Sequence, residues 1–542
     1  MSSSLEAGLR QWPAPTLHKV ANAGEATRAL ERIWSPPPSV CAVWMRAPTT
    51  RDAPLDAVCI GVESDTGTIA IVARGDAIAT TLGWLETHAQ AATHSPYVVM
   101  PHALPLLRTI PAHTWQPPRV GCIYTAHALL GMGGLRRPST GTLVESLVAT
   151  RLGQELYTPL CDEAEALARE TVAAIALMRD MTPALRANRL VASLEMECKL
   201  LPAVVRMERA GIAFDRKAFT QLTDAWDRER EALTLQETPD ESRTRRLDKL
   251  RSTYAHWGEQ FVGADGRIRC HLHPMATDSG RFSCSDPNLQ QVPSHGTAPG
   301  FRACFTAPEG SRLIVADYSQ IELRVAAQIA PCDALRAVFV RGGDPHTTTA
   351  ATLTGKPAAQ ISPLERKLAK AINFGFLFGM GARRFRDYAA ASYDLELDEQ
   401  QAQEARAAFL RTYPGIAAWH QRTGQLPRRS RDREVWVTTR LGRRRGFSVD
   451  AFSFTTALNI PVQGTAAEGF KLAMIALDEA LPAVDGVGVL CVHDEYLAQV
   501  PEAYATRARE LVVETMIQGM REVVPDVPIA VDAAICEHWE QA

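Results

Sequence analysis

The sequence predicts an α/β protein built from several domains. Its 542 residues suggest roughly three or four domains or subdomains. Apolar residues make up 46% of the chain and charged residues 22%, which is the composition of a globular protein with a sizeable core. Short apolar runs typical of strands alternate with stretches that favour helix along most of the chain.

In this prediction the first 185 residues form one α/β module. Strand-like runs cover residues 40–45 and 57–73, proline-rich segments interrupt the pattern, and a helix is expected from about residue 161 to 181. A charged region that favours helix follows from residue 195 to about residue 260. A turn-rich segment comes next, and strands and helices then alternate to the end.

Composition also narrows the cellular setting. No apolar run approaches the roughly 20 residues needed to cross a bilayer, and residues 1–15 lack the apolar segment of a signal peptide. We therefore expect a cytoplasmic protein without membrane contact. The 11 cysteines form no CxxC pair, which argues against a disulfide framework and against a cysteine zinc site. The net charge is −3, yet arginines gather at residues 383–386 and 428–445, either as a phosphate-binding surface or as a solvated face.

One expected helix, ERKLAKAINFGFLFGM at residues 365–380, carries cations and aromatic rings along one side. Arg366, Lys370, Phe374 and Phe378 recur every four residues, which places them in a stripe about 18 Å long. This length suits a nucleoside triphosphate, with cations for the phosphates and rings for the nucleoside. We expect the two glycines of this helix to leave room for a base pair. An amphipathic surface helix with a basic edge is the plainer alternative.

Two acidic strand ends lie on either side of this helix in the sequence. The apolar run 313–316 is typical of a buried strand that ends at Asp317, and VGVLCVHDEYLAQV is typical of a hairpin with Asp494 and Glu495 near its tip. Acidic residues at strand ends and turns are common, so each feature alone has a plain structural explanation. Together, two carboxylates could hold a pair of Mg²⁺ ions about 3.5–4 Å apart, as in phosphoryl transfer.

These stretches resemble the motifs of the family A DNA polymerases, the bacterial DNA polymerase I type. DYSQIELR at residues 317–324 resembles motif A, the RxxxKxxxF pattern of residues 366–374 resembles motif B, and HDE at residues 493–495 resembles motif C. SGRFSCSDPNLQQVP, DPHTTTA, YPGI, TRLGRRR and NIPVQGTAAE lie between or beside them in the family's order. The resemblance implies a right-hand polymerase with a shortened thumb at residues 186–270, a palm at 271–345 and 451–542, and fingers at 346–450.

The resemblance also implies a role for each matching residue. Two Mg²⁺ ions, replaceable by Mn²⁺, would bind Asp317, Asp494 and the backbone carbonyl of Tyr318, with Glu495 as a helper and Lys370 as a proton donor. Residues implied at the incoming dNTP are His346, Arg366, Lys370, Phe374, Phe378, Gln320 and Glu322, the last as a gate against a ribose 2′-OH. Residues implied at primer–template DNA are Arg281, Asn459, Gln463 and His493. We expect a monomer, and the sequence leaves open whether a processivity factor exists.

Besides the shortened thumb, the chain departs from the family pattern at Thr455, where bacterial members tend to carry Arg, at Phe378 and in residues 1–185. Phe378 stands where the family usually has Tyr, so the hydroxyl that would help to fix Glu322 is missing. Residues 1–185 take the place of an RNase H-like 3′–5′ exonuclease domain, but AVWM stands where a DxE is expected, and Tyr157 to Asp162 misses the YxxxD spacing by one residue. We expect an inactive domain kept as a scaffold. The alternative is a rearranged nuclease site built from Asp52, Asp56, Glu63 or Asp65.

The function expected from this resemblance is template-directed DNA synthesis in replication or repair, without proofreading. A single-subunit RNA polymerase would share the paired aspartates and the Arg/Lys helix, but Glu322 favours deoxynucleotides. A noncatalytic DNA-binding protein on a polymerase fold is a further alternative, and the retention of both aspartates argues against it.

Overall fold

The computed structural model describes residues 10–541 apart from 12, 35–37, 39, 47–56, 65–66, 90–96, 110–119, 132–142, 158–160, 236–239, 294–295 and 432. The chain forms two compact units, Met1–Arg206 and Met207–Ala542, which divide within helix α7 (Val191–Ala210). The predicted limits of the N-terminal domain, thumb, palm and fingers, of which residue 185 is the first, stay predictions. In the part of the chain that is described, no helix has both the length and the apolar character needed to cross a membrane.

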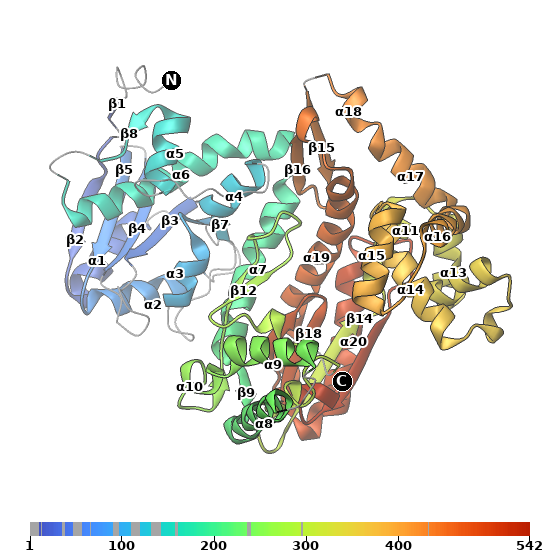
Figure 1. The fold of residues 1–542 in the computed structure, drawn as a ribbon. Coiled ribbons are helices and arrows are strands. Elements are labelled where there is room, and N and C mark those ends of the chain that lie inside the picture. The colour runs from blue at the N-terminus through green and yellow to red at the C-terminus, as the bar shows by residue number, and fades with distance from the viewer. Residues whose placement is uncertain are drawn as a thin grey trace. The chain divides into compact units, whose positions relative to one another are not determined.

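The first unit is built on a six-stranded mixed sheet, drawn in blue in Figure 1. The strand order is β2-β5-β4-β3-β6-β7; β3, β4 and β5 are antiparallel neighbours, whereas β6 and β7 run parallel to β3. An antiparallel meander continued by parallel strands is the RNase H-like arrangement that was predicted. The strands are β2 (Thr16–Val20), β3 (Val40–Arg46), β4 (Ala57–Ser64), β5 (Gly67–Ala73), β6 (Tyr97–Met100) and β7 (Val120–Cys122).

Helix α6 (Glu163–Ala187) covers β3, β4 and β5 and begins two residues later than predicted. Its Ala168 and Val172 join a core cluster with Cys59 and Val72 of the sheet. Helix α2 (Ala77–Ala89) also packs on β4 and β5. Six consecutive buried residues in β4 follow from this, because a strand covered on both faces reads as a continuous apolar run.

The second unit centres on an antiparallel sheet of four strands in the order β17-β18-β14-β19. The helices α19 (Phe454–Ala480) and α20 (Ala505–Arg521) pack against each other, and α20 lies on β14 and β19. The hydroxyl of the buried Tyr318 donates to the carbonyl of Met516 at 2.6 Å, which ties the end of β14 to α20. The strands are β14 (Ser311–Tyr318), β17 (Val487–Val492), β18 (Glu495–Pro501) and β19 (Val531–Cys536).

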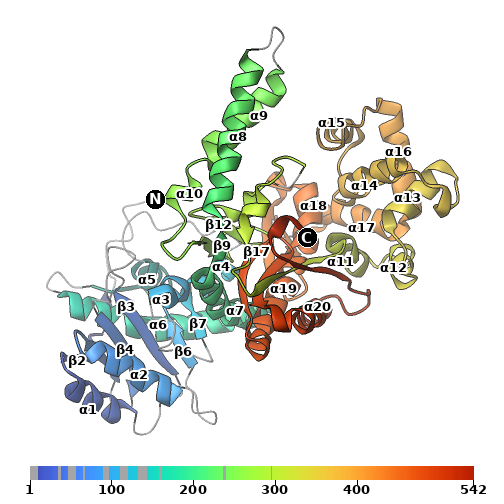
Figure 2. The ribbon, with the colours of Figure 1, turned by 90° about the horizontal axis from the view of Figure 1, so that it is seen from below.

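The second unit also has two helical parts, one before β14 in the sequence and one between β14 and β17. Helices α8 (Arg216–Thr234) and α9 (Glu241–Tyr254) form a hairpin that projects from the rest of the unit in Figure 2. Its base is fixed by aromatic packing, since the ring of the fully buried Phe301 lies 5.4 Å from Phe219, 5.0 Å from Tyr254 and 5.9 Å from Trp226 between centroids. The other part contains α13 (Pro345–Thr354), α14 (Pro363–Leu377), α15 (Ala382–Tyr393), α16 (Glu399–Thr412) and α17 (Pro414–Gly424).

Candidate active site

A single cavity of about 470 Å³ brings together most of the predicted site residues, although they come from distant parts of the sequence. Strand β14, the β17–β18 hairpin, α11 (Ile321–Ile329), α13 and α14 all contribute to it. Predicted residues that line the cavity are Arg281, Asp317, Tyr318, Gln320, Glu322, His346, Arg366, Lys370, Phe374, His493 and Asp494. Glu495, Phe378, Asn459 and Gln463 are not among the lining residues.

The sheet places the two aspartates beside each other. Asp317 is the penultimate residue of β14 and lies directly opposite Glu495 of β18, while Asp494 sits in the two-residue loop that joins β17 to β18. His493 in this loop has φ +59°, the left-handed conformation that such tight hairpins require. The predicted strand and the predicted hairpin are both present, and their pairing brings two carboxylates to one edge of the sheet.

Negative charge accumulates at this edge. Partial burial, followed by the nearby charges of Asp494, Glu495 and Asp532, raises the pKa of Asp317 to about 7. Burial also raises the pKa of Asp494, against the opposing charge of Arg281. Asp532, which sequence reasoning missed, lies opposite Asp317 on the neighbouring strand β19 and accepts a hydrogen bond from the Ser319 hydroxyl at 2.8 Å.

This carboxylate environment fits a divalent cation, because a positive charge would stabilise both carboxylates against the burial that raises their pKa values and, at Asp317, against the neighbouring negative charges as well. Among the described residues no three His, Cys, Asp or Glu side chains form a ready-made metal centre. Mg²⁺ does not need one, since it commonly takes one or two carboxylates and completes its octahedron with water and substrate phosphates. Asp317 and Asp494 supply two carboxylates, and Tyr318, the residue after Asp317, also lines the cavity.

Glu495 is turned toward a different neighbour. Its carboxylate accepts a hydrogen bond from the indole Nε1 of Trp539 at 3.0 Å, and the guanidinium of Arg302 lies 3.8 Å away. That guanidinium also stacks 4.1 Å from the centroid of the Trp539 ring. Burial raises the pKa of Glu495, while the hydrogen bond from Trp539 and the positive charge of Arg302 oppose the rise. The structure thus connects Glu495 to the C-terminal turn rather than to the cavity.

Helix α14 supplies the cations on the opposite side of the cavity. A capping box between Ser362 and Glu365 fixes its first turn, and Arg366 and Lys370 follow on one face. Arg366 Nε donates to Asp344 at 2.8 Å, whereas Lys370 Nζ has no hydrogen-bond or ion-pair partner among the described residues. The Phe374 ring is half-buried in the same wall.

The end of α14 differs from the expectation drawn from sequence. The helix ends at Leu377, so Phe378 is its C-cap and lies beyond the stripe, and Gly379 follows with φ +75°. A Cβ on Gly375 would lie 2.6 Å from the Phe385 ring of α15. The expectation that these glycines leave room for a base pair is therefore wrong. Gly375 allows close helix packing, and Gly379 adopts a backbone conformation that L side chains rarely take.

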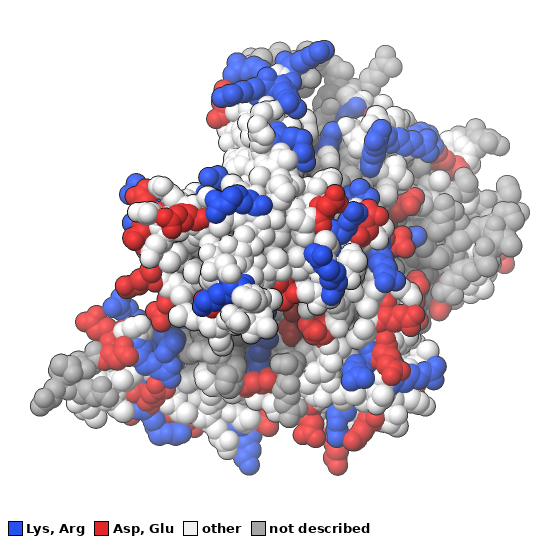
Figure 3. Space-filling view, turned by 90° about the vertical axis from the view of Figure 1, so that its right-hand side faces the viewer, with Lys and Arg blue, Asp and Glu red and all other residues white. Residues whose placement is uncertain are grey.

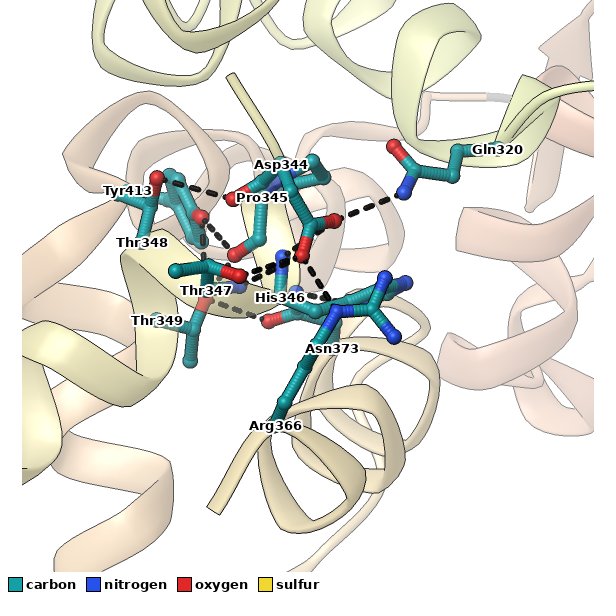
Figure 4. A network of polar contacts seen from close by, with 10 residues as sticks. All are labelled: Gln320, Asp344, Pro345, His346, Thr347, Thr348, Thr349, Arg366, Asn373 and Tyr413. Carbon is teal, nitrogen blue, oxygen red and sulfur yellow. Dashed lines mark hydrogen bonds and ion pairs between the residues drawn. The ribbon is translucent and has the colours of Figure 1, made fainter. Parts of the chain in front are cut away.

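A second polar network surrounds Asp344, the N-cap of α13 (Figure 4). Its carboxylate accepts from Gln320 Nε2 at 2.9 Å, from Arg366 Nε at 2.8 Å and from the Thr347 hydroxyl at 2.7 Å. Burial would raise the pKa of Asp344, but these hydrogen bonds outweigh it and lower the pKa well below its usual range. Sequence reasoning missed Asp344, although an Asp directly before Pro and a helix is a recognisable N-cap pattern.

Glu322 is held by two residues that were assigned to DNA. Arg281 donates to its carboxylate at 2.6 Å and Gln463 donates at 3.1 Å. Gln463 and Asn459 lie one turn apart on α19, so both side chains are on the same face of that helix. The carboxylate therefore has two fixed donors without any hydroxyl at position 378.

The arginines of residues 428–445 differ in exposure. On the face that Figure 3 shows, Lys and Arg side chains lie in separate groups, and acidic side chains lie between some of them. Arg443 is buried, and Arg444 stacks 4.3 Å from the centroid of the Trp436 ring. Arg445 pairs with Asp278 at 3.4 Å. Part of this cluster is therefore structural, and the exposed members are Arg428, Arg429, Arg431, Arg433 and Arg440.

Comparison with known proteins finds similarity to DNA polymerases. The model of DNA polymerase family A matches residues 206–541. DNA polymerase I of Thermus filiformis is 38% identical over 310 residues, which is 55% of this chain and 35% of the relative. DNA polymerase I of Pseudomonas aeruginosa is 36% identical over 316 residues, 55% of this chain and 32% of the relative. That of Aquifex aeolicus is 32% identical over 294 residues, 54% of this chain and 48% of the relative.

The chain thus spans between about a third and a half of the length of these relatives. A solved structure described as "POL domain of Pol1 from M. smegmatis complex with DNA primer-template and dNTP" has a TM-score of 0.81 at 22% identity, covering 97% of this chain and 100% of the other. This likeness shows the fold, a right-hand polymerase preceded by an α/β domain, as predicted.

Proposed function

Because the chain belongs to DNA polymerase family A, we propose that it is a template-directed DNA polymerase that adds dNTPs to a primer 3′ end by two-metal nucleotidyl transfer. One observation carries this proposal. The same cavity has two carboxylates on a sheet edge and the cations of α14 on its other wall. A nucleoside triphosphate needs both, since its phosphates require positive charge and its reacting centre requires metal ions.

The roles follow from position in the cavity. Asp317, Asp494 and the Tyr318 carbonyl would hold two Mg²⁺ or Mn²⁺ ions, which when bound stabilise the attacking and leaving oxygens. Arg366, Lys370 and His346 bind the triphosphate from the facing wall, and Lys370 donates a proton to the departing pyrophosphate. Phe374 packs against the sugar and base of the incoming nucleotide.

Two observations favour DNA over RNA synthesis and over simple DNA binding. The anchored carboxylate of Glu322 occupies the cavity wall, where it would exclude a 2′-OH. Both aspartates survive and face one cavity, which a protein that only binds DNA does not require. We also propose that Arg281, Gln463, Asn459 and His493 contact primer–template DNA, since Arg281 and His493 line the cavity and Gln463 bonds to Glu322 at its wall.

The partners that we propose are primer–template DNA and dNTPs, bound by a monomer. The protein named in the matching solved structure was in complex with primer-template and dNTP, which supports the same pair here. The thumb corresponds to the α8–α9 hairpin, whose helices have 19 and 14 residues. A short thumb contacts little duplex, so we expect low processivity without an accessory factor.

Primer extension tests the proposal. Plain and lesion-containing templates are offered with dNTPs and separately with NTPs, in Mg²⁺ and in Mn²⁺. Extension with dNTPs that exceeds extension with NTPs supports a DNA polymerase. Extension that prefers NTPs would instead support the RNA polymerase alternative, and DNA binding without extension would support the noncatalytic one.

We further propose that the first unit does not proofread. Strand β3 offers no carboxylate, and its Trp44 donates an indole hydrogen bond at 2.8 Å to Glu170 of α6. Tyr157 also donates to Glu170, so this carboxylate already has two neutral donors. Asp162 caps α6 and pairs with Lys19 instead.

The alternative nuclease site is only partly described. Glu63 lies on the surface and pairs with Arg179, while Asp52, Asp56 and Asp65 lie outside the described residues. A 5′-labelled primer with a 3′ mismatch, incubated with Mg²⁺ or Mn²⁺ and no dNTPs, should stay intact. An active nuclease site would instead shorten the primer. This shortening would persist in D317A and disappear in an Asp52/Asp56/Glu63/Asp65 quadruple alanine variant.

A further inference from the structure

His346 presents one ring nitrogen to the protein and the other toward the cavity. The residue is 2% exposed and lines the cavity beside Arg366 and Lys370. Its Nδ1 lies 2.9 Å from Nδ2 of Asn373. The other nitrogen, Nε2, has no hydrogen-bond partner among the described residues. A neutral imidazole has a proton on only one nitrogen. The position of that proton therefore decides whether His346 offers the cavity a hydrogen-bond donor or an acceptor.

The neighbours of Nδ1 favour one position for the ring proton. Asn373 is fully buried, and its Oδ1 lies 2.8 Å from the Thr349 hydroxyl, which also lies 2.9 Å from the Pro345 carbonyl. A hydroxyl has one proton to donate, and the Tyr413 hydroxyl already donates to that carbonyl, so the Thr349 proton is assigned to Asn373. The amide oxygen therefore faces Thr349, and the amide NH₂ faces His346. An amide NH₂ can only donate, which makes Nδ1 the acceptor and leaves the ring proton on Nε2.

A third buried group stabilises this orientation. The Tyr413 hydroxyl lies 3.0 Å from the Thr349 hydroxyl and 3.1 Å from the Pro345 carbonyl, to which it donates (Figure 4). Thr349 is fully buried and Tyr413 is 1% exposed, so water does not replace either contact. The hydrogen bonds run in one direction, from Thr349 through Asn373 to His346, and end at a donor that faces the cavity.

The charged groups around His346 keep its ring neutral. Burial, together with the positive charges of Arg366 and Lys370, lowers the pKa of His346 to about 4, although the negative charge of Asp344 opposes them. The Phe374 ring, whose centroid lies 5.8 Å from the imidazole centroid, adds no charge. A neutral histidine binds a phosphate only if the nitrogen that faces the phosphate carries the proton.

We propose that Asn373 is a positioning residue that holds neutral His346 in the Nε2–H tautomer, so that His346 donates a hydrogen bond to a phosphate oxygen of the incoming nucleotide. The phosphate contact rests on the proposed function, whereas the tautomer does not. Between about pH 6 and pH 8 this donor does not change its protonation. Arg366 and Lys370 supply the charge for phosphate binding, and His346 supplies a directed hydrogen bond.

The tautomer can be measured directly on the full-length protein. Labelling with ¹⁵N-histidine and recording long-range ¹H–¹⁵N correlation spectra distinguishes Nε2–H from Nδ1–H, and loss of one set of signals in H346Q assigns His346. We expect a protonated Nε2 and an unprotonated Nδ1, unchanged from pH 6 to pH 8. A protonated Nδ1 in the wild type would overturn the proposal, whatever the activity of the protein.

Asn373→Asp tests the function of this arrangement. The substitution keeps the side-chain shape but places an acceptor at Nδ1, which draws the ring proton to that nitrogen and leaves an Nε2 lone pair toward the phosphates. In single-turnover incorporation of dATP we expect a dissociation constant at pH 8 raised about tenfold or more, as for the loss of a hydrogen bond to a charged group. At pH 6 the imidazolium regains its Nε2–H, so binding should partly recover.

Two variants of Thr349 provide the matched comparison. Thr349→Ser keeps the hydroxyl donor and should behave as the wild type. Thr349→Val removes it and frees the Asn373 amide to turn, so it should shift both the histidine spectrum and dATP binding. Equal dATP affinity and equal pH dependence in wild type, N373D and T349V would refute the positioning role. Normal tautomer spectra in a protein without polymerase activity would instead place the error in the proposed function.

Discussion

Selection of the sugar is the prediction for which the structure supplies the most detail. The Glu322 carboxylate is 15% exposed and is held by Arg281 at 2.6 Å and by Gln463 at 3.1 Å. A ribonucleotide whose 2′-OH meets this carboxylate must displace it and break at least one of these hydrogen bonds. Removing the side chain removes that cost, so Glu322→Ala should accept ribonucleotides more readily.

The size of the effect follows from the two donors. A hydrogen bond to a charged group contributes about 1.5–3 kcal/mol, and 1.36 kcal/mol is a factor of ten, so E322A should raise the NTP/dNTP incorporation ratio about 10- to 150-fold. Gln463→Ala removes only the longer bond and should have a smaller effect. Phe378→Tyr adds a hydroxyl, but the Glu322 carboxylate already has two donors, so this substitution should lower the ratio by less than tenfold.

The assay is single-nucleotide incorporation with matched dNTP and NTP pairs, measured as kcat/KM for each, alongside primer–template Kd. Gln328→Ala serves as the control, because Gln328 lies on the same helix α11 but contacts Asp526 outside the cavity. If E322A changes kcat/KM for dNTP and NTP by the same factor, Glu322 is not the gate. If F378Y sharpens selection as strongly as E322A relaxes it, the Arg281 and Gln463 contacts do not hold the carboxylate.

Three further predictions address the metal site, the phosphates and a buried acid. Asp317→Ala or Asp494→Ala should abolish extension while primer–template binding persists, and more than a few percent of wild-type turnover in Mg²⁺ would contradict the metal assignment. Lys370→Ala should slow incorporation far more than it weakens DNA binding, and single-turnover kinetics that show a change in DNA affinity alone would exclude the triphosphate role. Burial raises the pKa of Glu468 from 4.5 to about 7, against hydrogen bonds from Thr439 and the Leu441 N–H. Because the folded state favours the neutral acid, its stabilising contribution is complete below pH 4.5 and is lost as pH rises through 7. Between pH 4.5 and pH 7 the wild type should therefore lose roughly 3 kcal/mol of unfolding free energy, and E468Q should not. If urea denaturation from pH 4.5 to pH 8 gives both proteins the same pH dependence of unfolding free energy, the raised pKa of Glu468 is contradicted.

Sequence reasoning succeeded where a short run of residues determines its own structure. The strand before Asp317, the hairpin around Asp494 and the helix that carries Arg366 and Lys370 each have a local apolar pattern or cap, and each was found at its predicted place. It did not identify Asp344, whose importance depends on Gln320 and Arg366, which are 24 and 22 residues away in the chain. Contacts of this kind are set by packing between elements and leave no local pattern.

The same limit explains the end of α14 and the anchoring of Glu322. The four-residue spacing predicts a helix through Phe378, but α14 ends at Leu377 and Gly379 adopts φ +75°. Phe454 and Leu458 of α19 lie within 2.8 Å of where a Cβ would be, so residue 379 can only be glycine, and this contact comes from a distant part of the chain. Gln463 lies 141 residues from Glu322 and holds it only because α19 packs against α11. A missing tyrosine hydroxyl was visible in the sequence, whereas its replacement by two donors was not.

The Asp344 carboxylate has a consequence for how this sequence can change over time. It joins Gln320, just beyond the end of β14, to Arg366 of α14, so three positions share one network. Loss of Asp344 alone would leave Arg366 without its counter-charge and Gln320 without its acceptor, and loss of Arg366 alone would leave a half-buried carboxylate with fewer donors. Single substitutions here are therefore costly, and viable variants must cross an intermediate of lower fitness. Drift at these three sites should occur as correlated pairs, which a deep mutational scan would detect as strong epistasis.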